Sequence, residues 1–172
     1  GGVVQADAGI LHIATTGGNT SDAGATWTAD GGDIRVAAQW EGTFTGTSAN
    51  GNHVEVTGSS NGAFENDFTV GAAGVTLNIT GDGFLWDNST IDTTAAGITN
   101  TGTLEINSGG AKTLTGGNDI VNTTGTVDFV GGAVTLDGSD IQNQNTLLIS
   151  GTTESSINGT GSLINDTGAT TN

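Results

Sequence analysis

Residues 97–106 have the sequence Gly-Ile-Thr-Asn-Thr-Gly-Thr-Leu-Glu-Ile, in which apolar and polar residues alternate on either side of a Thr-Gly pair. Alternation with a period of two predicts short, half-buried β-strands, and Asn and Gly favour the turns between them. Strands this short cannot bury a face in an isolated hairpin. The segment therefore needs neighbouring copies of itself on which to stack.

The apolar-x-apolar triplet that ends this segment recurs along the chain. Its copies are residues 11–13, 34–36, 54–56, 77–79, 104–106, 127–129 and 147–149, with a weaker copy at 163–165. The copies begin 16–27 residues apart, and repeats of this length are typical of solenoids, in which each coil stacks on the next. We predict an all-β, single-stranded parallel β-solenoid (β-helix) of about eight coils of 16–27 residues. An antiparallel β-sandwich is the alternative, but it does not explain the recurring unit.

Stacking in register makes specific predictions about the interior. Leu104, Val127 and Leu147 should be in contact inside the solenoid. The predicted inward columns are Leu77, Leu104, Val127, Leu147 and Leu163; Ile79, Ile106, Phe129 and Ile149; and Ile98, Ile120, Ile141 and Ile157. Gly or Asn stands two positions before most triplets, as at Gly102 and Gly125, which predicts a corner with a left-handed backbone.

The repeat is less regular in the first part of the chain. We therefore distinguish residues 1–74, which form less regular N-terminal coils or a cap, from residues 75–172, which form regular solenoid repeats. Proline is absent, which suits stacked ladders because proline cannot donate a ladder hydrogen bond.

The charge balance excludes several classes of partner and chemistry. Lys and Arg number 2 against 18 Asp and Glu, giving a formal net charge of −16. A chain of this sign is repelled by nucleic acids and by anionic membrane surfaces, and no apolar run is long enough to insert into a membrane. Cysteine is absent, which excludes disulfides and thiol chemistry. With two basic residues, the chain also lacks the cations that a lyase acting on uronic acids needs.

Calcium is the one metal that the sequence suggests, and no other cofactor is expected. The stretch Gly116-Gly117-Asn118-Asp119 resembles one copy of a calcium-binding β-roll repeat, and Asp137 and Asp140 partly repeat it in the next coil. Asp and Asn side chains supply the oxygen ligands that calcium prefers. The candidate calcium ligands are Asn118, Asp119, Asp137 and Asp140.

Two further sets of residues are candidates for contact with partners. Trp27, Trp40 and Trp86 are candidate stacking platforms for a glycan, whereas closing the end of the core is their simpler use. Leu148 and Ile164 take the place of polar residues at the outward position of their triplets, which predicts a contact surface.

Threonine pairs also repeat at equivalent positions, as in Thr101-Gly102-Thr103 and Thr124-Gly125-Thr126. Outward arrays of threonine on flat solenoids occur in several ice-binding proteins. The simpler interpretation is that threonine suits exposed strand positions.

The segments 97–106, 125–136 and 145–151 resemble the passenger regions of bacterial autotransporter and haemagglutinin-type adhesins, and the resemblance covers roughly residues 70–172. It implies a parallel β-helix on the cell exterior. We therefore expect an extracellular or cell-surface structural or adhesive protein without catalytic activity: a stalk, a filament subunit or an adhesin segment. Its expected partners are other copies of itself or neighbouring repeats, end-to-end or side-by-side, and surface glycans.

The alternative function is a carbohydrate-binding or carbohydrate-hydrolysing module of the tailspike type. Glu105 and Asp128 would stack in neighbouring coils as a pair of carboxylates, which is the kind of pair that glycoside hydrolysis requires. A solvated acidic face is the simpler interpretation of the same residues.

Overall fold

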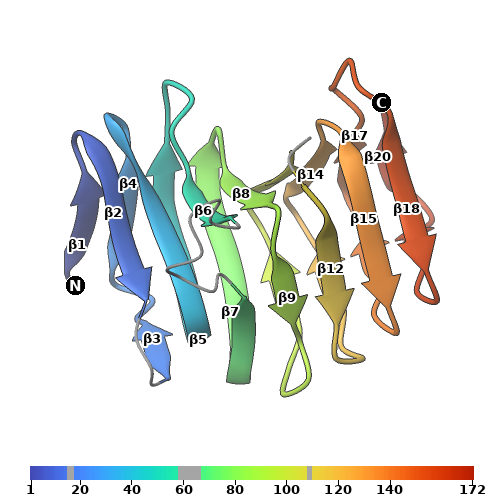
Figure 1. Ribbon diagram of the computed structural model, residues 1–172, viewed down its shortest axis with the longest axis horizontal. Helices are drawn as coiled ribbons and strands as arrows, with labels where there is room; N and C mark the ends of the chain where they lie inside the picture. The colour runs from blue at the N-terminus through green and yellow to red at the C-terminus, as the bar shows by residue number, and fades with distance from the viewer. Residues whose placement is uncertain (15–17, 58–66, 108–109) are drawn as a thin grey trace.

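The structure, a computed structural model, describes residues 1–14, 18–57, 67–107 and 110–172. In these residues the chain is all β, without helix, and every strand pairing is parallel. The strands wind through about seven turns of a β-solenoid, with the two termini at opposite ends of the stack (Figure 1). The prediction of a parallel β-solenoid is therefore confirmed, and the antiparallel sandwich is excluded.

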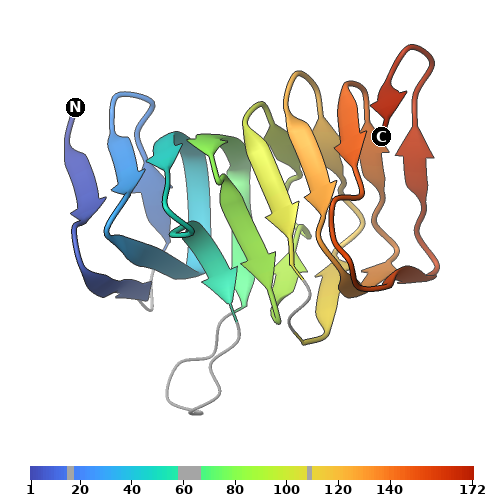
Figure 2. The same cartoon turned by 90° about the horizontal axis from the view of Figure 1, so that it is seen from above.

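Successive strands visit three parallel ladders in rotation, so that each coil has three sides (Figure 2). The first ladder contains β1 (Val3–Ala6), β4 (Thr26–Ala29), the last parts of β5 (Gly32–Ser48) and β7 (Phe68–Gly81), β10 (Ile98–Asn100), β13 (Ile120–Asn122), β16 (Ile141–Asn143) and β19 (Leu163–Asn165). The second contains β2 (Gly9–Ala14), the first part of β5, β6 (Val54–Thr57), β8 (Phe84–Asp87), β11 (Thr103–Ile106), β14 (Thr126–Phe129), β17 (Thr146–Leu148) and β20 (Thr170–Thr171). The third contains β3 (Asn19–Ser21), the middle of β5, the first part of β7, β9 (Thr90–Asp92), β12 (Lys112–Thr115), β15 (Gly132–Asp137) and β18 (Ser155–Gly159).

The central interior stack is the predicted one. Leu104 is the register partner of Val127, which in turn is the partner of Leu147. Their side chains are 0%, 0% and 3% exposed. The alternation of apolar and polar residues therefore places the aliphatic side chains of the second ladder inside, where burial of apolar surface stabilises the stack.

The predicted columns are wrong where they include the triplet at residues 77–79. The residue that stacks on Leu104 is Phe84, whereas Leu77 lies in the first ladder opposite Asn100. The strand β7 runs from the third ladder into the first without interruption, so its triplet belongs to another side of the coil. The last coil shows the same kind of error, because Leu163 pairs with Ile141 in the first ladder and Ile157 with Val134 in the third.

The glycines that precede the triplets are required for a different reason from the predicted one. Of the predicted corner positions two residues before a triplet, Gly9 has a positive φ, whereas Gly102 and Gly125 do not. A Cβ atom on Gly125 would lie 2.2 Å from the carbonyl oxygen of Gly102 in the coil before it, and one on Gly102 would lie 2.3 Å from that of Ile79. Close approach of neighbouring coils, rather than a left-handed backbone, therefore selects glycine there.

The tryptophans lie in the core. Trp27, Trp40 and Trp86 are 2%, 4% and 0% exposed. The rings of Trp27 and Trp40 pack around Phe44, with centroid distances of 4.8 Å and 5.2 Å. Each indole N–H donates within the protein: to Ser21 Oγ, to the Ala37 carbonyl and to the Ser89 carbonyl, respectively. Stacking of a glycan on these rings is therefore excluded by their burial, and the predicted glycan site is wrong for all three residues.

The N-terminal part of the chain contributes to the same three ladders. Strand β1 pairs with β4 in the first ladder, and β2 pairs with the first part of β5 in the second. The division of the chain near residue 74 stays a prediction. Among the described residues there is no helix that is long and apolar enough to cross a membrane.

Candidate functional site

The outward side of the second ladder carries most of the charge contacts of the molecule, and we call its outward residues the charged row. In register order the charged row is His12, Arg35, Glu55, Leu85, Glu105, Asp128 and Leu148. The middle residues of the repeated triplets predict this row except at two places. Leu85 occupies the rung expected for Asn78, and Ile164 lies instead in the first ladder, beside Gln142.

The first contact in the charged row joins two neighbouring coils. Arg35 Nε donates to Glu55 Oε1, and the side chain of Glu55 is only 6% exposed. Burial raises the pKa of Glu55, because desolvation disfavours the carboxylate, although the Arg35 guanidinium opposes this effect. Glu55 is thus a buried acid whose charge is compensated by one of the two basic side chains of the chain.

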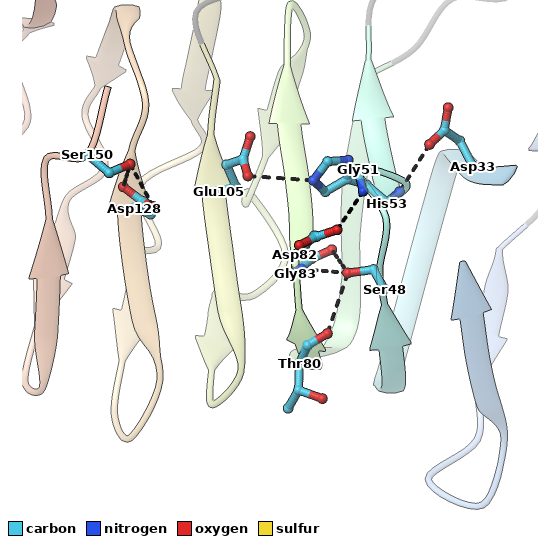
Figure 3. Close-up of polar contacts among 10 residues, drawn as sticks. All are labelled: Asp33, Ser48, Gly51, His53, Thr80, Asp82, Gly83, Glu105, Asp128 and Ser150. Carbon is cyan, nitrogen blue, oxygen red and sulfur yellow. Dashed lines mark hydrogen bonds and ion pairs between the residues drawn. The ribbon is translucent and has the colours of Figure 1, made fainter. Parts of the chain in front are cut away.

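The second contact spans two coils. His53 Nε2 lies 3.5 Å from Glu105 Oε2, across the rung occupied by Leu85 (Figure 3). The atom has no well-formed hydrogen bond at this distance, and the contact becomes an ion pair when His53 is protonated. Burial by itself lowers the pKa of His53, but the carboxylates of Glu105, Glu55 and Asp82 outweigh burial and raise the pKa above its ordinary value. His53 lies outside the repeated triplet, so the triplet pattern does not predict its contact.

Two aspartates hold the turn that presents His53. The backbone N–H of His53 donates to Asp33 Oδ1 over 3.0 Å, and the backbone N–H of Gly51 donates to Asp82 Oδ2 over 2.7 Å (Figure 3). Asp33 comes from the preceding coil and Asp82 from the following one. The turn is therefore tied to both of its neighbours, and these carboxylates are used for contacts between coils.

Similar contacts continue along the same side of the molecule. Beside the charged row, Ser150 Oγ donates to the Asp128 carboxylate, 2.7 Å and 2.9 Å from its two oxygens (Figure 3). In the first ladder, the buried Ser48 donates from its Oγ to the Gly83 carbonyl over 2.9 Å (Figure 3). Glu105 and Asp128 are register partners, as predicted, but Asp128 binds Ser150 and Glu105 binds His53. Arg35, Glu55, Glu105 and Asp128 of the charged row therefore make contacts that connect one coil to another.

The raised pKa of His53 gives a prediction for the pH dependence of stability. A histidine whose pKa is higher in the folded than in the unfolded state contributes stability below the unfolded value, and this contribution is lost as pH rises through the folded value. The raised pKa of Glu55 acts in the same direction. We expect the Tm of the wild-type chain to decrease as the pH is raised from about 6 to about 8. In His53→Gln this decrease should be smaller by roughly 2–4 °C, which corresponds to about 1 kcal/mol for such an ion pair.

His12→Gln is the matched control for this measurement, because His12 is an exposed histidine of the same row. Thermal unfolding followed by circular dichroism across this pH range measures the effect. An equal fall in Tm for wild type and His53→Gln would show that the contact between His53 and Glu105 does not stabilise the fold.

Inside the solenoid, the last residues of the first-ladder strands form a ladder of asparagine side chains. Asn100 Nδ2 donates to Asn122 Oδ1 over 2.9 Å, and Asn122 Nδ2 to Asn143 Oδ1 over 2.6 Å. Asn143 Nδ2 donates in turn to Asn165 Oδ1 over 2.6 Å. Asn100, Asn122 and Asn143 are completely buried, so their amides can be satisfied only within the protein. The sequence shows these Ile-x-Asn segments as short strands, but it does not predict that their asparagines stack inside the solenoid.

Asn118 and Asp119, two of the predicted calcium ligands, form hydrogen bonds with neighbouring coils. Asp119 Oδ1 accepts from the Asp140 backbone N–H, and Asp119 Oδ2 accepts from Gln142 Nε2. Asn118 Nδ2 donates to the Thr93 carbonyl, and Asp137 is exposed at the end of β15. No group of three or more His, Asp or Glu residues is arranged to hold a metal within the ranges that the structure describes. The contacts described here form without a metal ion, and the calcium site stays a prediction.

A shallow hollow lies beside this corner, over β7, β10 and β13. Its volume is about 370 Å³, and its lining includes Gly74, Thr76, Gly97, Thr99 and Asp119. Gly74 and Gly97 have no side chain to fill the hollow, and Asn118, Asp119 and Val121 line it from the next coil. The residues that were predicted to contact partners lie elsewhere: Leu148 is half-buried in the charged row, and Ile164 is 36% exposed in the first ladder.

Lys112 is an ionisable residue at an inward position. It stacks on Val134 in the third ladder, is completely buried, and its Nζ donates to the Gly110 carbonyl over 3.0 Å. Burial lowers the pKa of Lys112, an effect that the negative charge of Asp87 opposes. The burial of this cation was not predicted from the sequence.

Comparisons of the chain with protein-family models, with curated proteins and with solved structures find no match. The class of protein is therefore defined by the architecture: the chain is a parallel β-solenoid repeat protein. The resemblance to adhesin passenger regions is consistent with this fold, but no relative supports a narrower family.

Proposed function

We propose that the chain is a structural segment of an extracellular or cell-surface protein, serving as a stalk, filament subunit or adhesin segment without catalytic activity. The observation that supports this proposal is the use of polar side chains along the stack. The Asn ladder, the charged row and Asp119 all connect successive coils. Residues arranged in this way stabilise a rod, whereas a catalytic site needs groups that converge on one substrate.

The acidic composition suits the exterior of such a rod. The formal net charge of −16 keeps rods apart in solution and prevents non-specific association with anionic surfaces. The interior needs no disulfide, because coil-to-coil hydrogen bonds and apolar burial hold the stack.

The ends of the stack are the places where we propose contact with neighbouring coils or with another copy. Val3, Ile10 and Leu11 are 68%, 49% and 38% exposed in the first coil, and Ile149 is 58% exposed near the other end. Exposed apolar side chains beside unpaired parallel strands favour continuation of the ladders by further strands.

Location and lack of catalysis can be tested separately. We expect an antibody raised against the purified chain to label intact cells of the source organism as strongly as permeabilised ones. We also expect no product from a panel of polysaccharides. Labelling only after permeabilisation would contradict the proposed location. Hydrolysis that is lost in Glu105→Gln and kept in Glu154→Gln, an exposed acid outside the charged row, would establish the hydrolase alternative instead.

A further inference from the structure

Along one side of the solenoid the described outward residues of the strands are all uncharged, although the chain has 18 acidic residues. Asp119 lies at the edge of this side, where it accepts from Gln142 Nε2. This side is the outward surface of the first ladder. Its outward residues are Val3, Gln5, Thr26, Thr28, Thr43, Thr45, Thr47, Thr76, Asn78, Thr80, Thr99, Val121, Gln142 and Ile164. The outward surface of the second ladder, by contrast, contains the charged row, and that of the third contains acids such as Asp92 and Asp137. Outward acidic residues are thus found on the second and third ladders, and not among these residues of the first ladder.

Threonines on this uncharged side form a two-dimensional array, which we call the threonine face. Its three rows cross neighbouring strands in register: Thr28, Thr47 and Thr80; Thr26, Thr45 and Asn78; and Thr43, Thr76 and Thr99. Strands in a sheet lie about 4.8 Å apart, and alternate residues along a strand lie about 6.7 Å apart. Eight hydroxyls and eight methyl groups therefore repeat on a regular grid.

The grid is held by a rigid interior. The residues that alternate with the threonines point inward, and Trp27, Phe44 and Leu77 among them are at most 2% exposed. The Phe44 ring contacts Trp27, Trp40, Phe68 and Phe84 in the aromatic part of the core. Close packing below and ladder hydrogen bonds on both sides fix the positions of the threonine Cβ atoms.

The threonine hydroxyls are largely available to the surroundings. Among the described residues, Thr80 is the one threonine of the face whose hydroxyl donates to the protein, over 3.3 Å to the Gly46 carbonyl. Thr26, Thr47 and Thr80 are exposed, and the others are half-buried between their neighbours. The face thus presents ordered methyl and hydroxyl groups without the strongly hydrated ions found elsewhere on the molecule.

We propose that the threonine face binds ice. Planes of ice present neutral oxygen atoms that repeat at spacings close to the two spacings of this grid, so the threonine hydroxyls and the water between their methyl groups match the lattice over several repeats at once. A charged side chain would hold its own hydration shell and disturb such a lattice, which accounts for the uncharged outward residues of the described first-ladder strands. The inference is independent of the proposed structural function.

The test uses recrystallisation of ice and thermal hysteresis. We expect the wild-type chain to inhibit growth of ice crystals and Thr45→Lys, at the centre of the grid, to lose that activity. Thr47→Lys, at an exposed position of the face, should do the same and serves if Thr45→Lys does not fold. The matched control is Thr113→Lys, which makes the same change in charge between Thr90 and Thr135 on the third ladder. Circular dichroism verifies that each variant is folded.

Three outcomes would overturn the inference. The wild-type chain could show no effect on ice, or Thr113→Lys could lose activity as completely as the variants of the face. The face could also bind suspended crystalline cellulose or chitin while leaving ice unaffected, in which case its ligand is an ordered polysaccharide. Loss of activity in the two face variants with retention in the control supports ice binding.

Discussion

Replacing Asn122 with alanine is expected to lower the free energy of unfolding by about 2–4 kcal/mol, because it leaves buried polar groups on both sides without a partner. Asn122 accepts from Asn100 Nδ2 and donates to Asn143 Oδ1, and it also donates to the Gly125 and Thr146 carbonyls over 3.0 Å and 3.1 Å. Water cannot replace these contacts, since the side chain is completely buried. For a chain of this size the loss corresponds to a decrease in Tm of roughly 5–15 °C.

Asn158→Ala is the control for the Asn ladder. Asn158 is an exposed asparagine on β18, and its amide makes only a 3.4 Å contact with Ser156 Oγ. We expect the free energy of unfolding of this variant to lie within about 0.5 kcal/mol of the wild-type value. Chemical unfolding followed by circular dichroism gives both values. If Asn122→Ala were as stable as the control, the buried amides would not be stacked as described.

Replacing Leu104 with alanine is expected to destabilise the fold by about 2–5 kcal/mol, since it removes a buried side chain and leaves a cavity. Leu104 is completely buried between Phe84 and Val127 of the neighbouring coils. A solenoid coil contacts only its neighbours, so a cavity in a middle coil weakens the contacts on both sides of it. The expected decrease in Tm is roughly 5–15 °C.

Leu148→Ala provides the comparison, because Leu148 lies at an outward, half-buried position of the same ladder. The same chemical change there should cost less than about 1 kcal/mol, since little buried volume is lost. Equal losses in the two variants would mean that Leu104 does not face the interior, and the assignment of inward and outward sides in the second ladder would have to be reversed.

The candidate site could be predicted only in part. Arg35, Glu55, Glu105 and Asp128 were placed on the outward row because each occupies the middle of a triplet. His53 could not be predicted, since it lies in a turn outside the triplet and contacts a residue two coils away. For the three tryptophans, the sequence favoured a use in the core over glycan stacking but could not decide between them, because a tryptophan in an alternating strand is compatible with either side until the register is known.

The sequence alone determined that the chain stacks in parallel coils, because short alternating strands separated by glycine and asparagine can bury their apolar side only against a copy of themselves. Only the tertiary structure decided which of the three sides each strand occupies. The long strands β5 and β7 pass from one ladder to the next without a break between strands. The chain turns there at single residues with positive φ, Ala38 and Gly42 in β5 and Gly74 in β7, which is too short a signal to assign the sides from the sequence. The Asn ladder, the charged row and the threonine face each depend on that register, since their members are separated by about one coil in sequence and meet only when the coils are stacked.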